Sequence, residues 1–281
     1  MVIKECILKA SEILRASGTQ SNVLDARILL CKALGKDEIY LAINPTEEVD
    51  EKTETMFFDM VSRRMEGKPI AYITEEKEFM SLNFFVNENV LIPRPDTEHL
   101  AELAIEIAKE KQINDIADFC TGSGALAISI GKNCPFASVT GYDISDNALK
   151  VAEKNKQKLN AVNVEFKKLD VLKDLEKMKE KFSLVVSNPP YISADEMKTL
   201  PRDVDLFEPH LALFGGEDGL DFYKKIINDA NCFLKPKGIL AFEVGHTQAQ
   251  DVSKIMEAEF ENIKIKKDYA GIDRVVWGIK K

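Results

Sequence analysis

An asparagine, two prolines and a tyrosine, Asn188-Pro189-Pro190-Tyr191, follow an apolar run and precede a long loop. The Asn188 side-chain oxygen and the Pro189 carbonyl are hydrogen-bond acceptors in fixed positions, because proline restricts its own backbone and that of the preceding residue. Two such acceptors can take both N–H groups of a planar amide or aromatic amine and favour a pyramidal nitrogen whose lone pair attacks a methyl group. Tyr191 can lie against the flat face of the same group. We therefore predict a methyl-transfer site in which Asn188, Pro189 and Tyr191 are catalytic and all four residues bind the substrate.

A glycine-containing segment, Asp118-Phe119-Cys120-Thr121-Gly122-Ser123-Gly124, lies between a predicted strand and a predicted helix. Glycine lets the main chain turn tightly there and approach a ligand closely. Asp143 ends the next predicted strand, where its carboxylate can accept hydrogen bonds from both hydroxyls of a ribose. Together these features predict a site for an adenosine-containing cofactor.

The glycine segment also fits the Gly-x-Gly-x-x-Ala pattern of nicotinamide sites if Ala127 is the third member. Hydride transfer makes no use of two oxygen acceptors on a rigid Pro-Pro turn, whereas methyl transfer to an amide nitrogen does. The combination of the two motifs therefore favours S-adenosylmethionine as the cofactor.

A third predicted strand ends at Leu169-Asp170-Val171. Asp170 can accept a hydrogen bond from an adenine amino group, or it can cap a helix, and Val171 can pack against the adenine ring. Because the carboxyl ends of parallel strands meet at one edge of a sheet, we expect Asn188 to face the cofactor.

The elements that position these residues alternate between strand and helix. We predict strands near residues 115–120, 137–143, 162–167, 182–187, 237–244, 261–267 and 273–279, and helices near 124–133, 145–160, 218–234 and 247–259. This alternation indicates a mostly parallel sheet with helices on both faces. The last two strands are separated by a stretch too short for a helical crossover, so we expect them to be antiparallel. The 26 residues from Ile192 to Glu217 show little regular pattern, and we expect this loop to face the substrate.

The first part of the chain has the apolar spacing of helices, one of which Asp50 can cap. A β-hairpin is then predicted, with 82–86 and 90–92 as its strands, and Asp96 is placed to cap the helix that follows. We therefore predict three segments: a helical substrate-docking domain (1–78), a hairpin linker (79–92) and a catalytic domain (93–281).

Composition narrows the class of protein. The net charge is −9 and no basic face is obvious, so we expect no direct binding of nucleic acid. The five cysteines are scattered and never form Cys-x-x-Cys, and the histidines lack ligand spacing, so neither a disulfide framework nor a metal site is predicted. No apolar stretch approaches the roughly 18–20 residues that span a bilayer, and we expect a cytoplasmic monomer without a membrane partner.

The chain resembles the HemK/PrmC family of methyltransferases, which modify the glutamine of the Gly-Gly-Gln motif in peptide chain release factors. The matching segments are Gly67-Lys68-Pro69-Ile70-Ala71-Tyr72, Leu91-Ile92-Pro93-Arg94-Pro95-Asp96-Thr97-Glu98, Thr121-Gly122-Ser123-Gly124, Asp143-Ile144-Ser145, Asn188-Pro189-Pro190-Tyr191, Phe207-Glu208-Pro209 and Ala270-Gly271-Ile272-Asp273-Arg274. Asn-Pro-Pro-Tyr alone is shared with DNA adenine methyltransferases, whereas the Ile-Pro-Arg-Pro segment and the C-terminal block are more specific. The chain departs from the family at Glu75 and Ser81, where glycines are expected, which leaves the turn geometry of the linker open.

The resemblance implies a class I, Rossmann-like methyltransferase with a seven-stranded, mostly parallel sheet, an antiparallel last strand and a small N-terminal helical domain. It implies that S-adenosylmethionine is bound by Cys120, Thr121, Gly122, Ser123, Gly124, Asp143, Val171 and Asn188. It also implies that residues 188–191 bind the glutamine amide of a release factor, and that the helical domain helps to hold this protein partner.

Three alternatives stay open. An adenine-specific DNA or RNA amino-methyltransferase would use the same four residues, but it should flip a base and have a basic groove. A nicotinamide-dependent oxidoreductase would use only the glycine segment, and a non-enzymatic adaptor would keep the fold without the activity. Glu243, at the end of a predicted strand, can accept a proton from the methylated nitrogen, although a structural role is the simpler interpretation.

Overall fold

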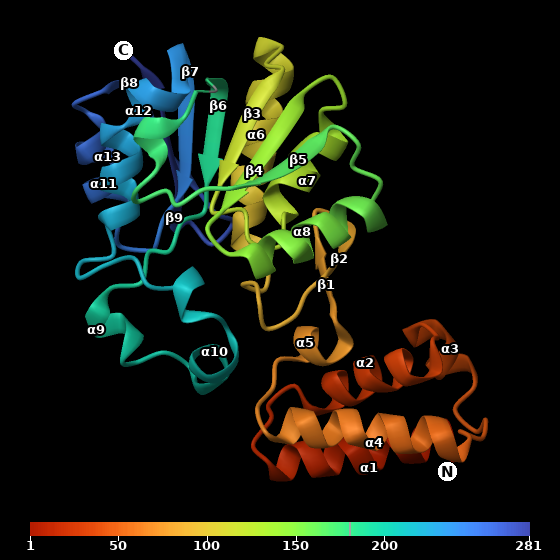
Figure 1. The fold of residues 1–281 in the computed structure, drawn as a ribbon. Helices are drawn as coiled ribbons and strands as arrows, with labels where there is room; N and C mark the ends of the chain where they lie inside the picture. Colours follow the sequence, from red (N-terminus) through yellow and green to blue (C-terminus); the bar gives the residue numbers. More distant parts are fainter. Residues whose placement is uncertain (180) are drawn as a thin grey trace. The chain divides into compact units, whose positions relative to one another are not determined.

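A computed structural model gives the fold of the protein and describes residues 1–179 and 181–281. The chain divides into two compact units (Figure 1). One comprises Met1–Glu76 and Arg202–Phe207, and the other comprises Lys77–Pro201 and Glu208–Lys281. The functional division at residues 78 and 92 stays a prediction.

The first unit is helical. Its helices are α1 (Ile3–Ala16), α2 (Asn22–Leu34), α3 (Glu38–Ile43), α4 (Glu51–Met65), α5 (Ile70–Thr74) and α10 (Arg202–Phe207). Apolar side chains of α1, α2 and α4 share one core. Asp50 caps α4 as predicted, because its carboxylate accepts from the main-chain N–H groups of Lys52 and Thr53. The short helices α3 and α5 were not predicted, since segments this short carry little periodic pattern.

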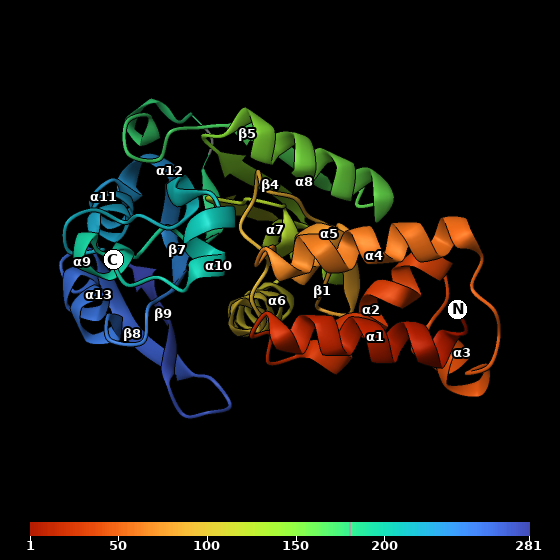
Figure 2. The same cartoon turned by 90° about the horizontal axis from the view of Figure 1, so that it is seen from below.

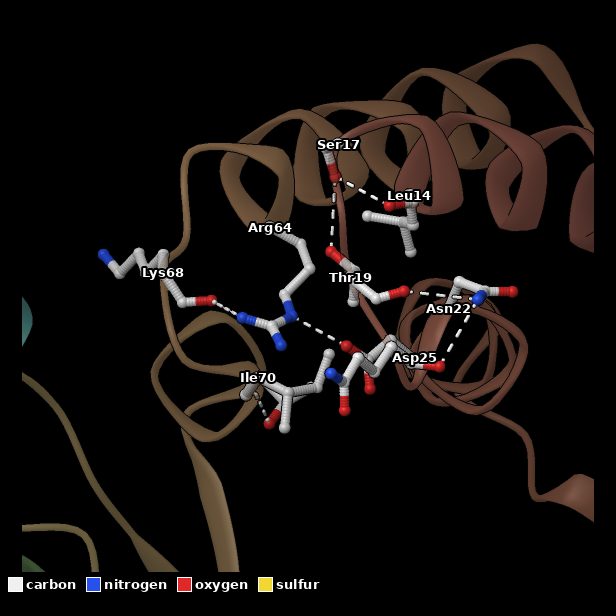
Figure 3. Close-up of polar contacts among 10 residues, drawn as sticks. Leu14, Ser17, Thr19, Asn22, Asp25, Arg64, Lys68 and Ile70 are labelled. Carbon is white, nitrogen blue, oxygen red and sulfur yellow. Dashed lines mark hydrogen bonds and ion pairs between the residues drawn. The ribbon is translucent and has the colours of Figure 1, made fainter. Parts of the chain in front are cut away.

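A buried ion pair joins α2 to α4 (Figure 3). Asp25 is 4% exposed, and its carboxylate accepts a hydrogen bond of 2.7 Å from Arg64 Nε. The same guanidinium donates to the Lys68 carbonyl at 3.1 Å, so it also holds the chain that leaves α4. A charge this deeply buried requires such a partner.

The hairpin lies one strand earlier in the chain than predicted. It consists of β1 (Glu76–Phe79) and β2 (Leu82–Phe85), whereas residues 90–92 form no strand. The polar and partly exposed β1 lacks the apolar pattern of a strand, and Val90 and Ile92 are buried in chain that belongs to no strand. The backbone is left-handed at Glu75 (φ 58°), Met80 (φ 50°) and Ser81 (φ 59°). Glu75 and Ser81 are the positions where the family was expected to have glycine, so the turn geometry is kept at a cost in strain.

The second unit is built on a seven-stranded sheet with the strand order β5-β4-β3-β6-β7-β9-β8 (Figure 1). The strands are β3 (Asp115–Phe119), β4 (Ser138–Asp143), β5 (Val164–Lys168), β6 (Phe182–Ser187), β7 (Leu234–Glu243), β8 (Phe260–Lys267) and β9 (Asp273–Lys280). The first five pair in parallel, and β9 is antiparallel to both β7 and β8. All seven predicted strands and the antiparallel last pair are confirmed.

Helices cover both faces of this sheet. They are α6 (Glu98–Lys111), α7 (Ala125–Asn133), α8 (Asp146–Lys158), α11 (Asp221–Asn228), α12 (Ala230–Phe233) and α13 (Ala249–Met256). Successive residues of β3 enter opposite cores: Ile116 packs with α6 and α7, and Ala117 with α11, α12 and α13. Figure 2 shows the last three helices grouped on one side of the sheet. This alternation is why the strands appear as continuous apolar runs.

Three other predictions were wrong in detail. The helix expected at 218–234 is divided into α11 and α12. The loop at 192–217 contains α9 (Ala194–Met197), α10 and the 3₁₀ turn His210–Ala212. Asp96 does not cap α6, because it lies in the 3₁₀ turn Pro95–Thr97, and its carboxylate pairs with Arg274 at 3.1 Å.

Candidate active site

A cavity of about 310 Å³ lies at the carboxyl edge of the parallel strands. The strand order reverses between β3 and β6, since β4 lies on one side of β3 and β6 on the other. Ligands of open α/β sheets bind at such a reversal. The cavity wall includes Asn89, Val90, Leu91, Cys120, Gly122, Asp143, Ile144, Ser145, Leu169, Asp170, Val171, Asn188, Pro190, Pro209, Leu211, Ala212 and Phe222. It therefore combines polar groups from strand ends with apolar groups from the loops.

The glycine turn between β3 and α7 brings main chain to the cavity. Cys120 and Gly122 have φ angles of 63° and 55°, so the backbone is left-handed on both sides of Thr121. A Cβ atom on Gly122 would meet no atom within 4 Å, so the main chain there is open to a ligand. Burial raises the pKa of the Cys120 thiol well above its usual value, so this thiol is neutral.

Asp143 is held rigidly at the end of β4. One carboxylate oxygen accepts from Gly122 N–H and the other from Ser145 N–H, each at 2.9 Å. Burial raises the pKa of this carboxyl, and these two N–H groups oppose the rise. The carboxylate lines the cavity and keeps free lone pairs for the hydroxyls of a bound ribose.

Two buried polar residues support the turn from behind. Asp118 is 1% exposed and accepts from Thr121 Oγ1 at 2.6 Å, and burial raises the pKa of Asp118 to about 7. Asn155 of α8 donates to the carbonyls of Ser123 and Phe85 and accepts from Phe85 N–H. It thereby ties the glycine turn to β2.

Asn188 follows β6 and reaches the cavity wall. Its amide nitrogen Nδ2 donates to Thr97 Oγ1 at 3.1 Å, which turns this nitrogen toward the protein. No described residue donates to its Oδ1 atom. The amide oxygen is therefore free of donors from the described residues, and its role as an acceptor for a substrate N–H group stays a prediction.

The main chain of the Pro-Pro-Tyr segment is held by close contacts. Gln248 donates to the Tyr191 carbonyl at 2.9 Å and accepts from Gly245 N–H at 3.1 Å. A Cβ atom on Gly215 would lie 2.6 Å from the Pro190 carbonyl oxygen, so only glycine fits beside the segment. Burial raises the pKa of the Tyr191 hydroxyl to about 12, which keeps it neutral at physiological pH.

The predicted site residues do not all reach the cavity. Those on its wall are Cys120, Gly122, Asp143, Val171, Asn188 and Pro190. Thr121, Ser123 and Gly124 lie behind the wall and shape the turn. Tyr191 lines a second hollow of about 230 Å³ with Thr199 and His246. Asp170 accepts from Leu172 N–H at 3.0 Å and also lies on the main wall, so both of its predicted roles are compatible with the geometry.

Sequence reasoning missed several supporting residues. Asn155 is one, Thr97 is another, and Glu208 is a third. Glu208 is 4% exposed, pairs with Arg94 at 2.5 Å and accepts from Ile92 N–H at 3.3 Å. It therefore joins the loop at 192–217 to the segment that follows the hairpin. An asparagine among the lysines of α8 was the only available signal for Asn155.

The cavity suits S-adenosylmethionine. Asp143 offers a carboxylate for ribose, Gly122 leaves the main chain accessible, and Val171 and Phe222 supply apolar surface for a flat ring. In the described part of the chain, no group of three or more His, Cys, Asp or Glu side chains could hold a metal ion. Nor is any described helix long and apolar enough to cross a membrane.

This sheet order, with its reversed last strand and its site at the strand-order reversal, places the chain among the class I S-adenosylmethionine-dependent methyltransferases. The fold matches the hMettl16 catalytic domain, solved in complex with MAT2A 3'UTR hairpin 6, with a TM-score of 0.57 and 13% identity over 78% of this chain and 81% of that one. A methyltransferase from Pyrococcus furiosus matches with a TM-score of 0.51 and 17% identity, over 79% of this chain and 98% of that one. The predicted fold class, enzyme class and cofactor are confirmed.

Sequence comparison defines the family. The family described as PrmC N-terminal domain matches residues 5–74, and the Methyltransferase small domain matches residues 98–202. A release factor glutamine methyltransferase of Clostridium acetobutylicum is 43% identical over 100% of this chain and 99% of its own length. Those of Bacillus cereus and Vibrio cholerae are 36% and 38% identical over 99% of this chain, and over 99% and 96% of their own lengths. The chain belongs to the family of release factor glutamine methyltransferases.

Proposed function

We propose that this chain methylates the side-chain amide nitrogen of the glutamine in the Gly-Gly-Gln motif of peptide chain release factors. The observation that carries the proposal is the orientation of Asn188, whose Nδ2 atom faces Thr97 and whose Oδ1 atom is left as an acceptor at the cavity wall. An acceptor there suits a substrate that presents N–H groups. The names of the relatives, release factor glutamine methyltransferases, support the choice of substrate.

In the proposed reaction, Asn188 Oδ1 and the Pro189 carbonyl each accept one N–H of the glutamine amide. They turn the nitrogen lone pair toward the cavity, and their interaction strengthens as the nitrogen becomes positive. When bound, S-adenosylmethionine supplies an electrophilic methyl group on a sulfonium sulfur. The amide nitrogen gains this methyl group and loses one proton to solvent. Tyr191 and Pro190 confine the flat amide, so orientation supplies much of the rate.

The proposed cofactor contacts divide into two kinds. Asp143, Cys120, Gly122, Val171 and Asn188 line the cavity and are proposed to touch the cofactor directly. Thr121, Ser123 and Gly124 are proposed to act by fixing the shape of the turn.

Residues 1–78 are proposed as the part of the chain that holds the release factor, with residues 79–92 as the linker. We further propose that the enzyme acts in the cytoplasm, as a monomer, on the release factor itself and without binding nucleic acid. The net charge of −9 supports the last point.

Incubation of the full-length chain with S-adenosylmethionine and purified release factors tests the proposal. We expect one added methyl group, located by tandem mass spectrometry on the glutamine of the Gly-Gly-Gln peptide. A release factor with asparagine in place of that glutamine is the matched substrate control. Methyl transfer to an adenine-containing oligonucleotide, with none to the release factor, would instead favour the amino-methyltransferase alternative.

Two variants of the chain separate binding from catalysis. Asn188→Ala should keep much of the cofactor affinity but lower the methylation rate by roughly 100-fold, the effect of losing one preorganised polar contact. Asp143→Asn should weaken cofactor binding by about 1.5–3 kcal/mol, the range for hydrogen bonds to a charged group, as measured by calorimetry. Asp146→Asn changes an exposed carboxylate nearby and is the control.

A further inference from the structure

Two loop segments that are far apart in the sequence form part of the cavity wall. One consists of residues 89–91, and the other contains Pro209, Leu211 and Ala212. In the described structure, neither segment belongs to a strand or an α-helix, so the sheet does not fix their positions. Leu211 is apolar but 59% exposed, so packing against the protein holds its side chain only weakly. The place of these walls must therefore depend on other contacts.

One buried carboxylate joins the two segments. Glu208 directly precedes Pro209, and its Oε2 atom accepts at 3.3 Å from the N–H group of Ile92, the residue after Leu91. Its Oε1 atom pairs with Arg94 Nη2 at 2.5 Å. The side chain of Glu208 is 2% exposed, and each of its oxygens has a donor. A single residue thus connects the start of one wall segment to the end of the other.

The second wall segment is held at both of its ends. After it, Ile192 N–H donates to the Leu213 carbonyl and Gly215 N–H donates to the Ile192 carbonyl, each at 2.9 Å. Before it, Glu208 is the residue at which the chain returns to the second unit after α10. The segment between these two anchors is short and carries three residues of the cavity wall.

Stability alone is a poor explanation for this buried ion pair. Taking a carboxylate out of water costs free energy that pairing only roughly repays, so such a pair adds little to the stability of a fold. What it does fix is geometry, because each carboxylate oxygen needs its donor in one place. Removing one partner would leave a buried polar group without its donor, and separation of the two segments would let water reach that group.

We propose that Glu208 is a positioning residue that, together with Arg94, clasps the two wall segments and so sets the affinity and the residence time of S-adenosylmethionine in the cavity. It acts through its neighbours on the wall, Leu91 and Pro209. When the clasp is absent, the cavity has its binding-competent shape for only part of the time, and the apparent affinity falls in proportion. The proposal rests on the proposed cofactor site and does not depend on which substrate receives the methyl group.

Three variants test the clasp. Glu208→Gln keeps the shape and an acceptor for Ile92 N–H but removes the charge, and Arg94→Gln removes the guanidinium. The third variant combines both changes. Two residues that act as one pair should not lower the affinity further when both are changed, whereas independent residues should show losses that add.

Asp115→Asn is the matched control. Asp115 begins β3, at the end of the strand away from the cavity. Its carboxylate also joins a cation to a main-chain donor, since it pairs with Lys235 at 2.5 Å and accepts from Ser183 N–H. Loss of this charge should therefore disturb a similar arrangement without moving either wall segment.

The measurements are S-adenosylmethionine affinity by calorimetry, its dissociation rate by chase of labelled cofactor, and hydrogen exchange of the free chain. We expect Glu208→Gln and Arg94→Gln each to lower the affinity by about 10-fold, chiefly through faster dissociation, and the double variant to be no weaker. Hydrogen exchange should become faster at 209–214 in both single variants. Asp115→Asn should keep the affinity, and kcat at saturating cofactor should stay near that of the unaltered chain in every variant.

Each outcome supports or overturns the clasp. Unchanged affinity in Glu208→Gln refutes it, and so does a double variant in which the two losses add. An equal loss of affinity in Asp115→Asn would show a general effect of stability, which also refutes it. If Glu208→Gln does not fold, affinity and hydrogen exchange in Arg94→Gln decide. If the unaltered chain binds S-adenosylmethionine but does not methylate glutamine, the proposed function fails while this inference can still be tested by binding.

Discussion

Gly124 is expected to tolerate no side chain, and replacing it by alanine tests the packing behind the glycine turn. Its φ angle is 77°, and an added Cβ atom would lie 2.7 Å from Phe166 Cζ and 3.1 Å from Ala152 Cβ. The left-handed backbone costs a non-glycine residue about 1–2 kcal/mol. Overpacking a filled core costs about 1–3 kcal/mol more. Gly124→Ala should therefore destabilise the second unit, which comprises Lys77–Pro201 and Glu208–Lys281 and is called the catalytic unit below, by about 2–5 kcal/mol.

Gly122→Ala is the matched control within the same turn. Its φ angle is 55°, so it has the same backbone cost, but its Cβ atom would meet nothing within 4 Å. It should lose only about 1–2 kcal/mol of stability. Because Gly122 lines the cavity and Gly124 does not, Gly122→Ala should lower the affinity for the cofactor more than Gly124→Ala does.

Urea unfolding followed by tryptophan fluorescence measures the difference, because the only tryptophan, Trp277, lies in β9 of the catalytic unit. With a denaturant slope of about 2 kcal/mol per molar, Gly124→Ala should lower the midpoint by about 1–2.5 M. Adding Phe166→Leu should recover part of that loss by relieving the clash. Equal losses for the two alanine variants, or no recovery in the double variant, would refute the packing argument.

Arg64→Met should destabilise the helical unit by roughly 3 kcal/mol in circular-dichroism melts, because it leaves the buried Asp25 unpaired, and Asp25→Leu combined with it should recover much of the loss. Ser81→Gly should stabilise the catalytic unit by about 1 kcal/mol in urea unfolding, since it relieves a left-handed φ of 59°; an unchanged midpoint would show that the turn is unstrained. Burial raises the pKa values of Asp118 and Glu243 to about 7, so the folded state binds more protons than the unfolded state from about pH 4 to pH 7. Their contribution to the free energy of unfolding is thus greatest below pH 4 and is lost as the pH rises to 7. Glu243→Gln should remove roughly 3 kcal/mol of that change. If the free energy of unfolding of Glu243→Gln falls with pH as steeply as that of the unaltered chain, the prediction is contradicted.

Much of the catalytic fold could be predicted because its strands are buried on both faces. Segments such as Leu184–Val186 pack into both cores, so they appear in the sequence as short continuous apolar runs. The hairpin was misplaced because its first strand, Glu76–Phe79, is mostly polar and is stabilised by pairing with β2. No apolar pattern marks a strand of that kind. Val90 and Ile92 have the apolar spacing of a strand, but they are buried in a segment without regular secondary structure.

The candidate site was predictable to the extent that it follows strand ends. Asp143 and Asn188 lie at the carboxyl ends of parallel strands, and that position alone brings them to one cavity. Thr97, Asn155 and Glu208 could not be found in this way, because each has a partner 70 or more residues away in the sequence. Contacts of that separation depend on how α6, α8 and the long loop pack, which local spacing does not encode.

The remaining freedom of the site lies in one side chain. The Pro189 carbonyl belongs to a main chain that two prolines, Gln248 and Gly215 hold in place, so this acceptor has a fixed position. The second acceptor, Asn188 Oδ1, sits on a side chain with two rotatable bonds, and an amide fills the same space in either of two orientations. A rigid backbone cannot choose between these orientations, but a hydrogen-bond acceptor behind the amide can. The proposed geometry, with two oxygen atoms directed at one nitrogen, therefore depends on the Thr97 hydroxyl as much as on the prolines.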